Sequence, residues 1–285
     1  MKILWISDFS LSHTKGGAQR SDDIIINHGL KNNLDITWFT HDSDRNLLYK
    51  PYDRVISTNL EQISQSRPYV IDWLQHHPNH SRLEHDMNAY LSTDDRKLLF
   101  DSCKNTFFLT NYHYELFKNT YGDIFKNVKI VQDPVETNSF YDKKLEREDK
   151  VLYAGFMHVL KGTETFFNYV LNSPSTQFVV AGWGAAVYQF LAEKAPNVEY
   201  LGIVDYSEMP NVYNKYKTLF YHPLVTEPFC RTVCEALLCG IQLNVNPNNI
   251  GCISEANRIG IEKFKINCNN APADFWQFVL KENNE

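Results

Sequence analysis

Short apolar runs recur along this chain at the spacing of alternating strands and helices, and the series occurs twice. In the first half, strands are predicted at Ile3–Ile6, Ile36–Phe39, Val70–Leu74, Phe107–Leu109 and Val128–Val131. In the second half, they are predicted at Val151–Ala154, Phe178–Ala181, Val198–Leu201, Leu219–Tyr221 and Leu243–Val245. Helices are predicted between the later runs, at Thr163–Asn172 and Ala185–Lys194. This alternation predicts an α/β fold in which helices cover parallel sheets.

The chain is long enough for two lobes. Its 285 residues exceed the roughly 100–200 residues of a typical domain. Asp133 and Pro134, followed by the charge-rich stretch 142–150, have the composition of an exposed connection. We therefore predict two Rossmann-like lobes, residues 1–149 and residues 150–285. Because ligands bind at the carboxyl ends of strands in open α/β sheets, two facing sheets would form a substrate cleft.

Composition and charge argue against several classes of protein. The opening apolar run ends at Asp8, and no stretch approaches the roughly 20 apolar residues of a membrane span, so a cytoplasmic protein without a transmembrane segment is expected. The formal charge of −6, with both signs interspersed, gives no basic stripe typical of nucleic-acid binders, although a cleft can still be locally basic. The six cysteines lack paired metal-ligand spacing and are expected to be reduced and mostly buried.

The most informative segment is Thr226–Gly240, which follows a predicted strand. Glu227 lies at the exit of that strand, and Glu235 lies inside the next predicted helix. Phe229 and Arg231 fall near the N-terminus of the helix, where free backbone N–H groups and the helix dipole favour an anion or sugar hydroxyls. The glycine that closes the segment is expected to end the helix.

This segment resembles the signature of family-four retaining glycosyltransferases of the GT-B fold, which reads approximately Glu-Pro-Phe-Gly-x-x-x-x-Glu-Ala-x-Ala-x-Gly. Three more segments resemble family motifs in the right order. They are the glycine-rich turn Lys15–Arg20, the Val-Gly-Arg…Lys-Gly segment at Tyr153–Gly162 and the Gly-Gly-x-x-Glu loop at Ile250–Glu255. The resemblance covers nearly the whole chain and implies two facing Rossmann-like lobes in a compact form, an architecture that some viral DNA-modifying transferases share.

The resemblance implies roles for the matching residues. Glu235 is expected to bind the ribose hydroxyls and Glu227 the transferred sugar, because a carboxylate accepts hydrogen bonds from adjacent hydroxyls. Lys161 is expected to neutralise the diphosphate that leaves. The other donor-binding candidates are the backbone at Phe229, Cys230 and Arg231, the residues His158, Ile203 and Val204, and Gly16 and Gly17 of the glycine-rich turn.

The chain departs from the family at Phe156, which stands where relatives have an arginine that binds the diphosphate. His158 and Arg231 are the candidates to replace that cation. If neither does, the donor is bound weakly or the transferase is degenerate. The base pocket is expected around Gly202–Val204 and near Gly182–Gly184, and these segments do not distinguish uridine from guanosine or adenosine.

In the first lobe, the segment Leu83–Asp86 resembles the histidine-bearing loop with which many relatives touch the transferred sugar. It is expected to follow the predicted strand at Val70–Leu74. His85 would hydrogen-bond the sugar near the reacting carbon, and Asp86 would orient the ring or meet the acceptor. Arg20 is a further candidate on the acceptor side.

A metal site is the alternative interpretation of the same region, because four histidines crowd it. Their spacing fits no common zinc pattern, and Pro78 interrupts the helix that could align them. We therefore expect no metal and no cofactor. The four are His76, His77, His80 and His85.

The resemblance implies a retaining, metal-independent glycosyltransferase that moves a sugar from a nucleotide-sugar, with a UDP-sugar favoured, to a hydroxyl acceptor. A glycan, a small metabolite and a hydroxymethylated DNA base are the candidate acceptors. The alternative is a nucleotide-sugar-binding module that has lost turnover.

Many relatives end with a helix that returns to brace the first lobe. Here Pro272–Lys281 is the segment able to do so, with Phe275, Trp276 and Phe278 as anchors.

Overall fold

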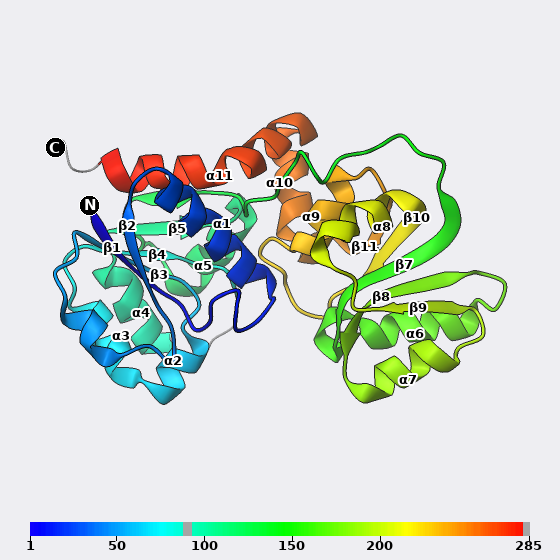
Figure 1. The fold of residues 1–285 in the computed structure, drawn as a ribbon, viewed down its shortest axis with the longest axis horizontal. Helices are drawn as coiled ribbons and strands as arrows, with labels where there is room; N and C mark the ends of the chain where they lie inside the picture. The colour runs from blue at the N-terminus through cyan, green and yellow to red at the C-terminus, as the bar shows by residue number, and fades with distance from the viewer. Residues whose placement is uncertain (88–92, 282–285) are drawn as a thin grey trace. The chain divides into compact units, whose positions relative to one another are not determined.

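The chain folds into two compact units, each built on its own parallel sheet (Figure 1). The computed structural model describes residues 1–87 and 93–281. Unit 1 comprises Met1–Pro134 and Ile266–Glu285, and unit 2 comprises Val135–Lys265. The predicted α/β class is confirmed. The predicted lobes also included residues 88–92 and 282–285, which lie outside the described part of the chain.

The division between the units corrects the boundary expected between residues 149 and 150. The chain leaves unit 1 at Pro134, and the charge-rich stretch, although largely exposed, belongs to unit 2 and does not connect the units. The Arg147 guanidinium donates to the carbonyl oxygens of Tyr213 and Cys239, at 2.5 and 2.6 Å. Charge density alone therefore did not mark a linker, because a single arginine can satisfy several buried carbonyl groups.

Unit 1 contains a parallel sheet with the strand order β2-β1-β3-β4-β5-β6. Its described strands are β1 (Lys2–Ile6), β2 (Asp35–Phe39), β3 (Arg54–Ser57), β4 (His80–Leu83), β5 (Asn105–Phe108) and β6 (Val128–Ile130). Its described helices are α1 (Gly17–Lys31), the 3-10 helix η1 (Arg45–Tyr49), α2 (Glu61–Ser66), α3 (Pro68–Gln75), α4 (Thr93–Ser102), α5 (Asn111–Tyr121) and most of α11 (Ile261–Lys281).

Unit 2 contains a parallel sheet with the strand order β11-β10-β7-β8-β9. Its strands are β7 (Glu148–Met157), β8 (Phe178–Gly184), β9 (Val198–Gly202), β10 (Tyr216–Tyr221) and β11 (Gln242–Val245). Its α-helices are α6 (Thr163–Asn172), α7 (Ala186–Lys194), α8 (Met209–Lys215), α9 (Arg231–Leu238), α10 (Gly251–Ile259) and the start of α11, and its 3-10 helices are η2 (Val159–Lys161), η3 (Tyr206–Glu208) and η4 (Pro247–Asn249). Every strand predicted in this half is confirmed.

The strand predicted at Val70–Leu74 was wrong, because this segment lies in α3. Val70, Ile71 and Leu74 are buried, and their spacing places them on one face of a helix. Pro68 occupies the start of the helix, where its missing N–H removes no hydrogen bond. A run this short does not distinguish a buried strand from a buried helix by apolar content alone.

Two strands of unit 1, β3 and β4, were not predicted. Both carry large polar side chains that are nevertheless buried, namely Arg54, His80 and Arg82. The segment Leu83–Asp86 therefore follows β4 and not the segment in α3.

Each central strand of unit 1 contributes to two cores, since successive side chains point to opposite faces. In β1, Ile6 packs in the cluster formed with α2 and α3, whereas Trp5 contacts Phe275 of α11. In β5, Phe108 packs with α4 and α5, and Phe107 contacts Phe275. Helices α2 to α5 thus cover one face of the sheet, and α11 covers the other.

The expected C-terminal brace is present within unit 1. The Trp276 side chain is 3% exposed, and its Nε1 donates to the carbonyl oxygen of Ile25 on α1 at 2.7 Å. A Cβ at Gly29 would lie 2.9 Å from the indole, so α1 needs a glycine at this crossing. Among the helices that the structure describes, none combines the length and apolarity required to cross a bilayer.

The substitution Trp276→Ala is expected to lower the free energy of unfolding of unit 1 by about 3–5 kcal/mol, because it empties a buried aromatic site. Ile266→Ala, at a position on the same helix that is 57% exposed, is the control and should change it by less than about 0.5 kcal/mol. Urea denaturation measures both values. Equal effects of the two substitutions would show that the indole does not brace unit 1.

Candidate functional site

In unit 2 the strand order reverses between β7 and β10, which are hydrogen-bonded neighbours. At such a switch point the loops leaving adjacent strands diverge and leave room for a ligand at their carboxyl ends. The loop after β7 carries Lys161, and the loop after β10 carries Glu227. The topology of unit 2 therefore brings two of the predicted residues to one point.

Lys161 and Glu227 form an ion pair at this point. Lys161 Nζ lies 2.5 Å from Glu227 Oε1, and the Tyr221 hydroxyl donates to the same oxygen at 3.2 Å. The lysine side chain is 36% exposed and the glutamate 12%. Backbone bonds fix the glutamate, because its N–H donates to the Asn249 carbonyl and its carbonyl accepts from Gly251. The ammonium thus remains accessible while the carboxylate is held rigidly.

Glu235 belongs to a second polar cluster on α9. Its Oε1 accepts a hydrogen bond from the Tyr206 hydroxyl at 2.9 Å and lies 3.3 Å from Arg231 Nη2. Arg231 also donates to the Tyr206 hydroxyl at 2.9 Å. Burial, together with the Glu235 charge, raises the pKa of Tyr206, so its hydroxyl stays protonated as a donor. Sequence reasoning missed Tyr206, because nothing in η3 matches a motif.

The backbone at the start of α9 is unusual at Cys230. This residue caps the helix with φ 72°, a left-handed conformation that favours glycine. Cys230 occupies the position at which the signature it resembles has a glycine. Burial raises the pKa of its thiol, so the thiolate that reacts as a nucleophile is not populated. All six cysteines are buried thiols outside any disulfide, which confirms the expectation of reduced, buried cysteines.

Phe156, at the position expected for an arginine, lies at the end of β7 and is 42% exposed. Its ring contacts Trp183 at 4.5 Å and stacks on His158 with centroids 5.8 Å apart. His158 Nδ1 accepts the N–H of Leu160. Of the two candidate replacements, Arg231 is paired with Glu235 and His158 is stacked on an aromatic ring.

The other predicted segments of unit 2 follow β9 and β11, and the segment expected to be a Gly-Gly-x-x-Glu loop lies mostly in the helix α10. Ile203 and Val204 follow β9, and Ile203 is 76% exposed. Glu255 of the predicted Gly-Gly-x-x-Glu loop is buried on α10 and pairs with Arg258 at 2.5 Å. The start of α10 is tied to the site, because the N–H of Cys252 donates to the carbonyl oxygen of Phe229.

In unit 1 the strand order reverses between β1 and β3. The loop after β1 leads to Gly16 and Gly17, which cap and begin α1, and Arg20 lies in the first turns of that helix. The loop after β3 begins with Thr58, which is fully buried. His85 follows the neighbouring strand β4 at the same edge.

His85 is held by Asp22, a residue of α1 that sequence reasoning missed. His85 Nε2 lies 3.0 Å from Asp22 Oδ1, and the Thr58 hydroxyl donates to Asp22 Oδ2 at 2.8 Å. Burial alone would lower the pKa of His85, but the Asp22 hydrogen bond and the charges of Asp22, Asp133 and Asp86 raise it to about 9. The residue expected to orient the ring, Asp86, instead accepts a hydrogen bond from Asn59 at 3.0 Å.

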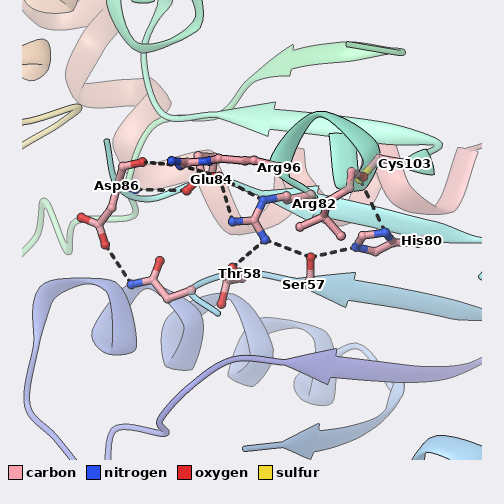
Figure 2. A network of polar contacts seen from close by, with 10 residues as sticks. Ser57, Thr58, His80, Arg82, Glu84, Asp86, Arg96 and Cys103 are labelled. Atoms are coloured by element: carbon pink, nitrogen blue, oxygen red, sulfur yellow. Dashed lines mark hydrogen bonds and ion pairs between the residues drawn. The ribbon is translucent and has the colours of Figure 1, made fainter. Parts of the chain in front are cut away.

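A buried charge network holds Glu84 and Asp86, the residues that flank His85 in the sequence (Figure 2). Arg82 donates to Glu84 through Nε and Nη2, at 2.9 and 2.8 Å, and to the carbonyl oxygen of Thr58. Arg96 lies 3.5 Å from the same Glu84 oxygen and donates to the carbonyl oxygen of Asp86. These bonds fix the backbone on both sides of His85.

The histidines considered for a metal do not converge. His80 is fully buried and contacts Ser57 and Cys103, whereas His85 contacts Asp22. His76 is exposed beside Asp72. Within residues 1–87 and 93–281, no group of His, Cys, Asp and Glu side chains is arranged to hold a metal ion.

Comparison with solved structures identifies the architecture. HepE from Anabaena, solved with UDP-glucose, superimposes with a TM-score of 0.67 and 14% identity over 97% of this chain and 99% of HepE. Sucrose-phosphate synthase from Thermosynechococcus elongatus gives 0.67 and 11% over 98% and 96%. Both are GT-B proteins. This chain has the GT-B fold.

A third GT-B structure is an alpha-glucosyltransferase in complex with UDP and a 13-mer DNA, with a TM-score of 0.57 and 14% identity over 97% of this chain and 92% of that one. No protein-family model and no curated protein matches the chain by sequence. The match to the GT-B fold is therefore a match of structure, and the predicted fold is confirmed.

Gly162 ends the 3-10 helix η2 directly after Lys161, so its conformation fixes the backbone next to this lysine. Gly162 has φ 78°, and a Cβ there would collide with the carbonyl oxygen of His222. Gly162→Ala is expected to cost more than about 2 kcal/mol of unfolding free energy, since backbone strain of about 1–2 kcal/mol adds to the collision. Gly202→Ala, at φ 67° with open space around it, should cost only the strain. Denaturation curves test the difference, and equal losses would contradict it.

The buried histidines of unit 1 predict a maximum of stability near pH 6.5. Burial lowers the pKa of His80 and His113 to about 3, so below 6.5 the unfolded chain binds more protons and stability falls with acid. The raised pKa of His85 makes the folded chain bind more protons above 6.5, so stability falls as pH rises toward 9.

The slope between pH 6.5 and 8 is expected to be on the order of 1 kcal/mol per pH unit. Urea denaturation across this range measures it, and His85→Gln should flatten it. An unchanged slope in His85→Gln would show that another group causes the decline.

Proposed function

We propose that this chain is a family-four glycosyltransferase that transfers a sugar from a UDP-sugar to a hydroxyl acceptor, with retention of configuration and without a divalent metal. The observation that carries the proposal is the meeting of Lys161, Glu227 and the start of α9 at the switch point of unit 2. A cation, a fixed carboxylate and a helix N-terminus together suit a sugar attached to a diphosphate.

Glu235 is proposed to bind the ribose. It is 5% exposed, and its carboxylate can accept up to about four hydrogen bonds. Tyr206 and Arg231 hold one of its oxygens and so fix the direction in which the carboxylate accepts further bonds. A carboxylate can accept two parallel hydrogen bonds from a vicinal diol, and the ribose of a nucleotide carries such a diol.

Lys161 is proposed to bind the diphosphate. Its ammonium has three protons, so it can keep its bond to Glu227 and still donate to a phosphate oxygen. The first-turn N–H groups of α9 add partial positive charge from the same side. As the bond to the sugar breaks, negative charge grows on the diphosphate, and these groups stabilise it without a metal.

Glu227 and His85 are proposed to bind the transferred sugar. The glutamate would accept hydrogen bonds from sugar hydroxyls, and the backbone at Phe229, Cys230 and Arg231 would read the remaining ones. Asp86 and Arg20 of unit 1 are the proposed acceptor-side residues. The acceptor is a glycan, a small molecule or a hydroxymethylated DNA base.

The second candidate function is binding of a nucleotide-sugar without turnover. It is favoured by Phe156, an exposed ring at the position of an expected cation, and by the engagement of Arg231 with Glu235. Loss of one cation reduces the stabilisation of a leaving diphosphate more than it reduces binding of the base and ribose.

The donor site is tested by the shift in melting temperature with UDP-, GDP-, ADP- and TDP-sugars. We expect a UDP-sugar to raise the melting temperature, and Glu235→Ala and Lys161→Ala to weaken its binding about ten- to hundredfold, since each removes hydrogen bonds to a charged group. Glu193→Ala and Lys217→Ala are the matched controls, because both residues lie on the exposed surface of unit 2.

Product analysis then separates the two candidate functions. Release of UDP and transfer or hydrolysis of the sugar would support the transferase, whereas binding without product would support the module. If no nucleotide-sugar changes the melting temperature, both functions are excluded.

A further inference from the structure

Asp22 is a buried carboxylate in the middle of a helix, outside every motif that the proposed function uses. It is 1% exposed, and Thr58, its partner from the loop after β3, is fully buried. Burying a charge is costly unless strong hydrogen bonds compensate, and Asp22 has one at each oxygen. The Thr58 hydroxyl fixes one oxygen, so the other is directed at His85.

The charges that act on His85 come from several elements of unit 1. Asp22 lies on α1, Asp86 in the same loop, and Asp133 after β6, and all three favour the protonated ring. His113 on α5 is neutral, because burial lowers its pKa to about 3. Arg96 on α4 is bound to Glu84, so this cation is already balanced by a carboxylate.

We propose that Asp22 is a positioning residue that fixes His85 through Nε2 and keeps the imidazole protonated, so that the ring presents Nδ1–H to an oxygen of the substrate. The proposal rests on the proposed function for the identity of that substrate. It differs from the interpretation based on sequence, in which Asp86 orients the ring or meets the acceptor.

The geometry favours Asp22 over Asp86 for this role. Asp22 Oδ1 is within 3.0 Å of the ring nitrogen, whereas the Asp86 carboxylate is held by Asn59. A carboxylate bonded to one nitrogen of a histidine fixes both the tautomer and the orientation of the ring. A protonated ring then donates a hydrogen bond that is shorter and stronger than one from a neutral ring.

The proposal makes the activity depend on the protonation of one histidine. With a pKa of about 9, His85 is mostly protonated at both pH 6 and pH 8. If loss of the Asp22 charge lowers the pKa to about 7, the protonated fraction at pH 8 falls about tenfold but stays close to complete at pH 6. A merely structural role for Asp22 would reduce activity equally at both pH values.

The first experiment follows His85 by NMR in the full-length protein labelled at histidine, with His85→Gln to assign its signal. In Asp22→Asn, which keeps the shape of the side chain, the titration midpoint should fall by about two units. Asp23→Asn is the matched control, because it removes the same charge from the next residue, whose partner is Asn27 and not His85. An unchanged midpoint in Asp22→Asn would overturn the proposal.

Thr58→Val provides a second test if Asp22→Asn does not fold. It removes the hydroxyl that orients the carboxylate but retains the Asp22 charge. We expect a smaller fall in the midpoint and a broadened His85 signal. An identical titration to that of the wild type would show that the Thr58 hydroxyl does not direct the Asp22 carboxylate at His85, and it would overturn the positioning argued here from that bond.

The second experiment measures kcat for sugar transfer at pH 6 and pH 8. Asp22→Asn should lower kcat about tenfold at pH 8 and leave it near the wild-type value at pH 6, with Asp23→Asn unchanged at both. A uniform loss at both pH values would overturn the role of the charge. If the wild type transfers no sugar but the NMR midpoint shifts as expected, the proposed function fails and the positioning of His85 by Asp22 stands.

Discussion

The parallel arrangement of strands in each sheet is the constraint on which the rest of the structure depends. Because all strands of a parallel sheet run in one direction, every loop that follows a strand emerges at the same edge. Residues far apart in sequence are thereby brought together, as with Lys161 and Glu227, which are 66 positions apart and 2.5 Å from each other. Both faces of such a sheet are buried, so chemistry is confined to its edges.

The sequence predicted the strands correctly where they are apolar, and the prediction failed where polar side chains are buried within a strand. All strands of unit 2 were predicted, because runs such as Phe178–Ala181 are apolar throughout. Strands β3 and β4 were not predicted, because each contains a buried arginine, Arg54 in β3 and Arg82 in β4. The Arg82 guanidinium bonds to the carbonyl oxygen of Thr58, which lies in another loop. An apolar run predicts a buried strand, but a buried strand whose polar side chains are hydrogen-bonded has no such run.

The residues of the candidate site also include some that the sequence could predict and some that it could not. Motif spacing was sufficient to place Glu227 and Glu235 around the start of α9, because one strand, one loop and one helix determine that geometry. The partners of Glu235 and His85 were not predictable, since Tyr206 and Asp22 reach them from separate elements. A hydrogen bond between elements depends on how they pack, and a single sequence does not record that packing.

Helix α11 has a consequence for the order in which the chain folds. Unit 1 is discontinuous, because its sheet is formed from residues before Pro134 and one face of that sheet is covered by residues after Lys265. During synthesis, the whole of unit 2 leaves the ribosome before Phe275 and Trp276 are available to cover Trp5. The nascent chain therefore exposes an aromatic surface on unit 1 until α11 has been synthesised, and transiently exposed apolar surface of this kind favours aggregation.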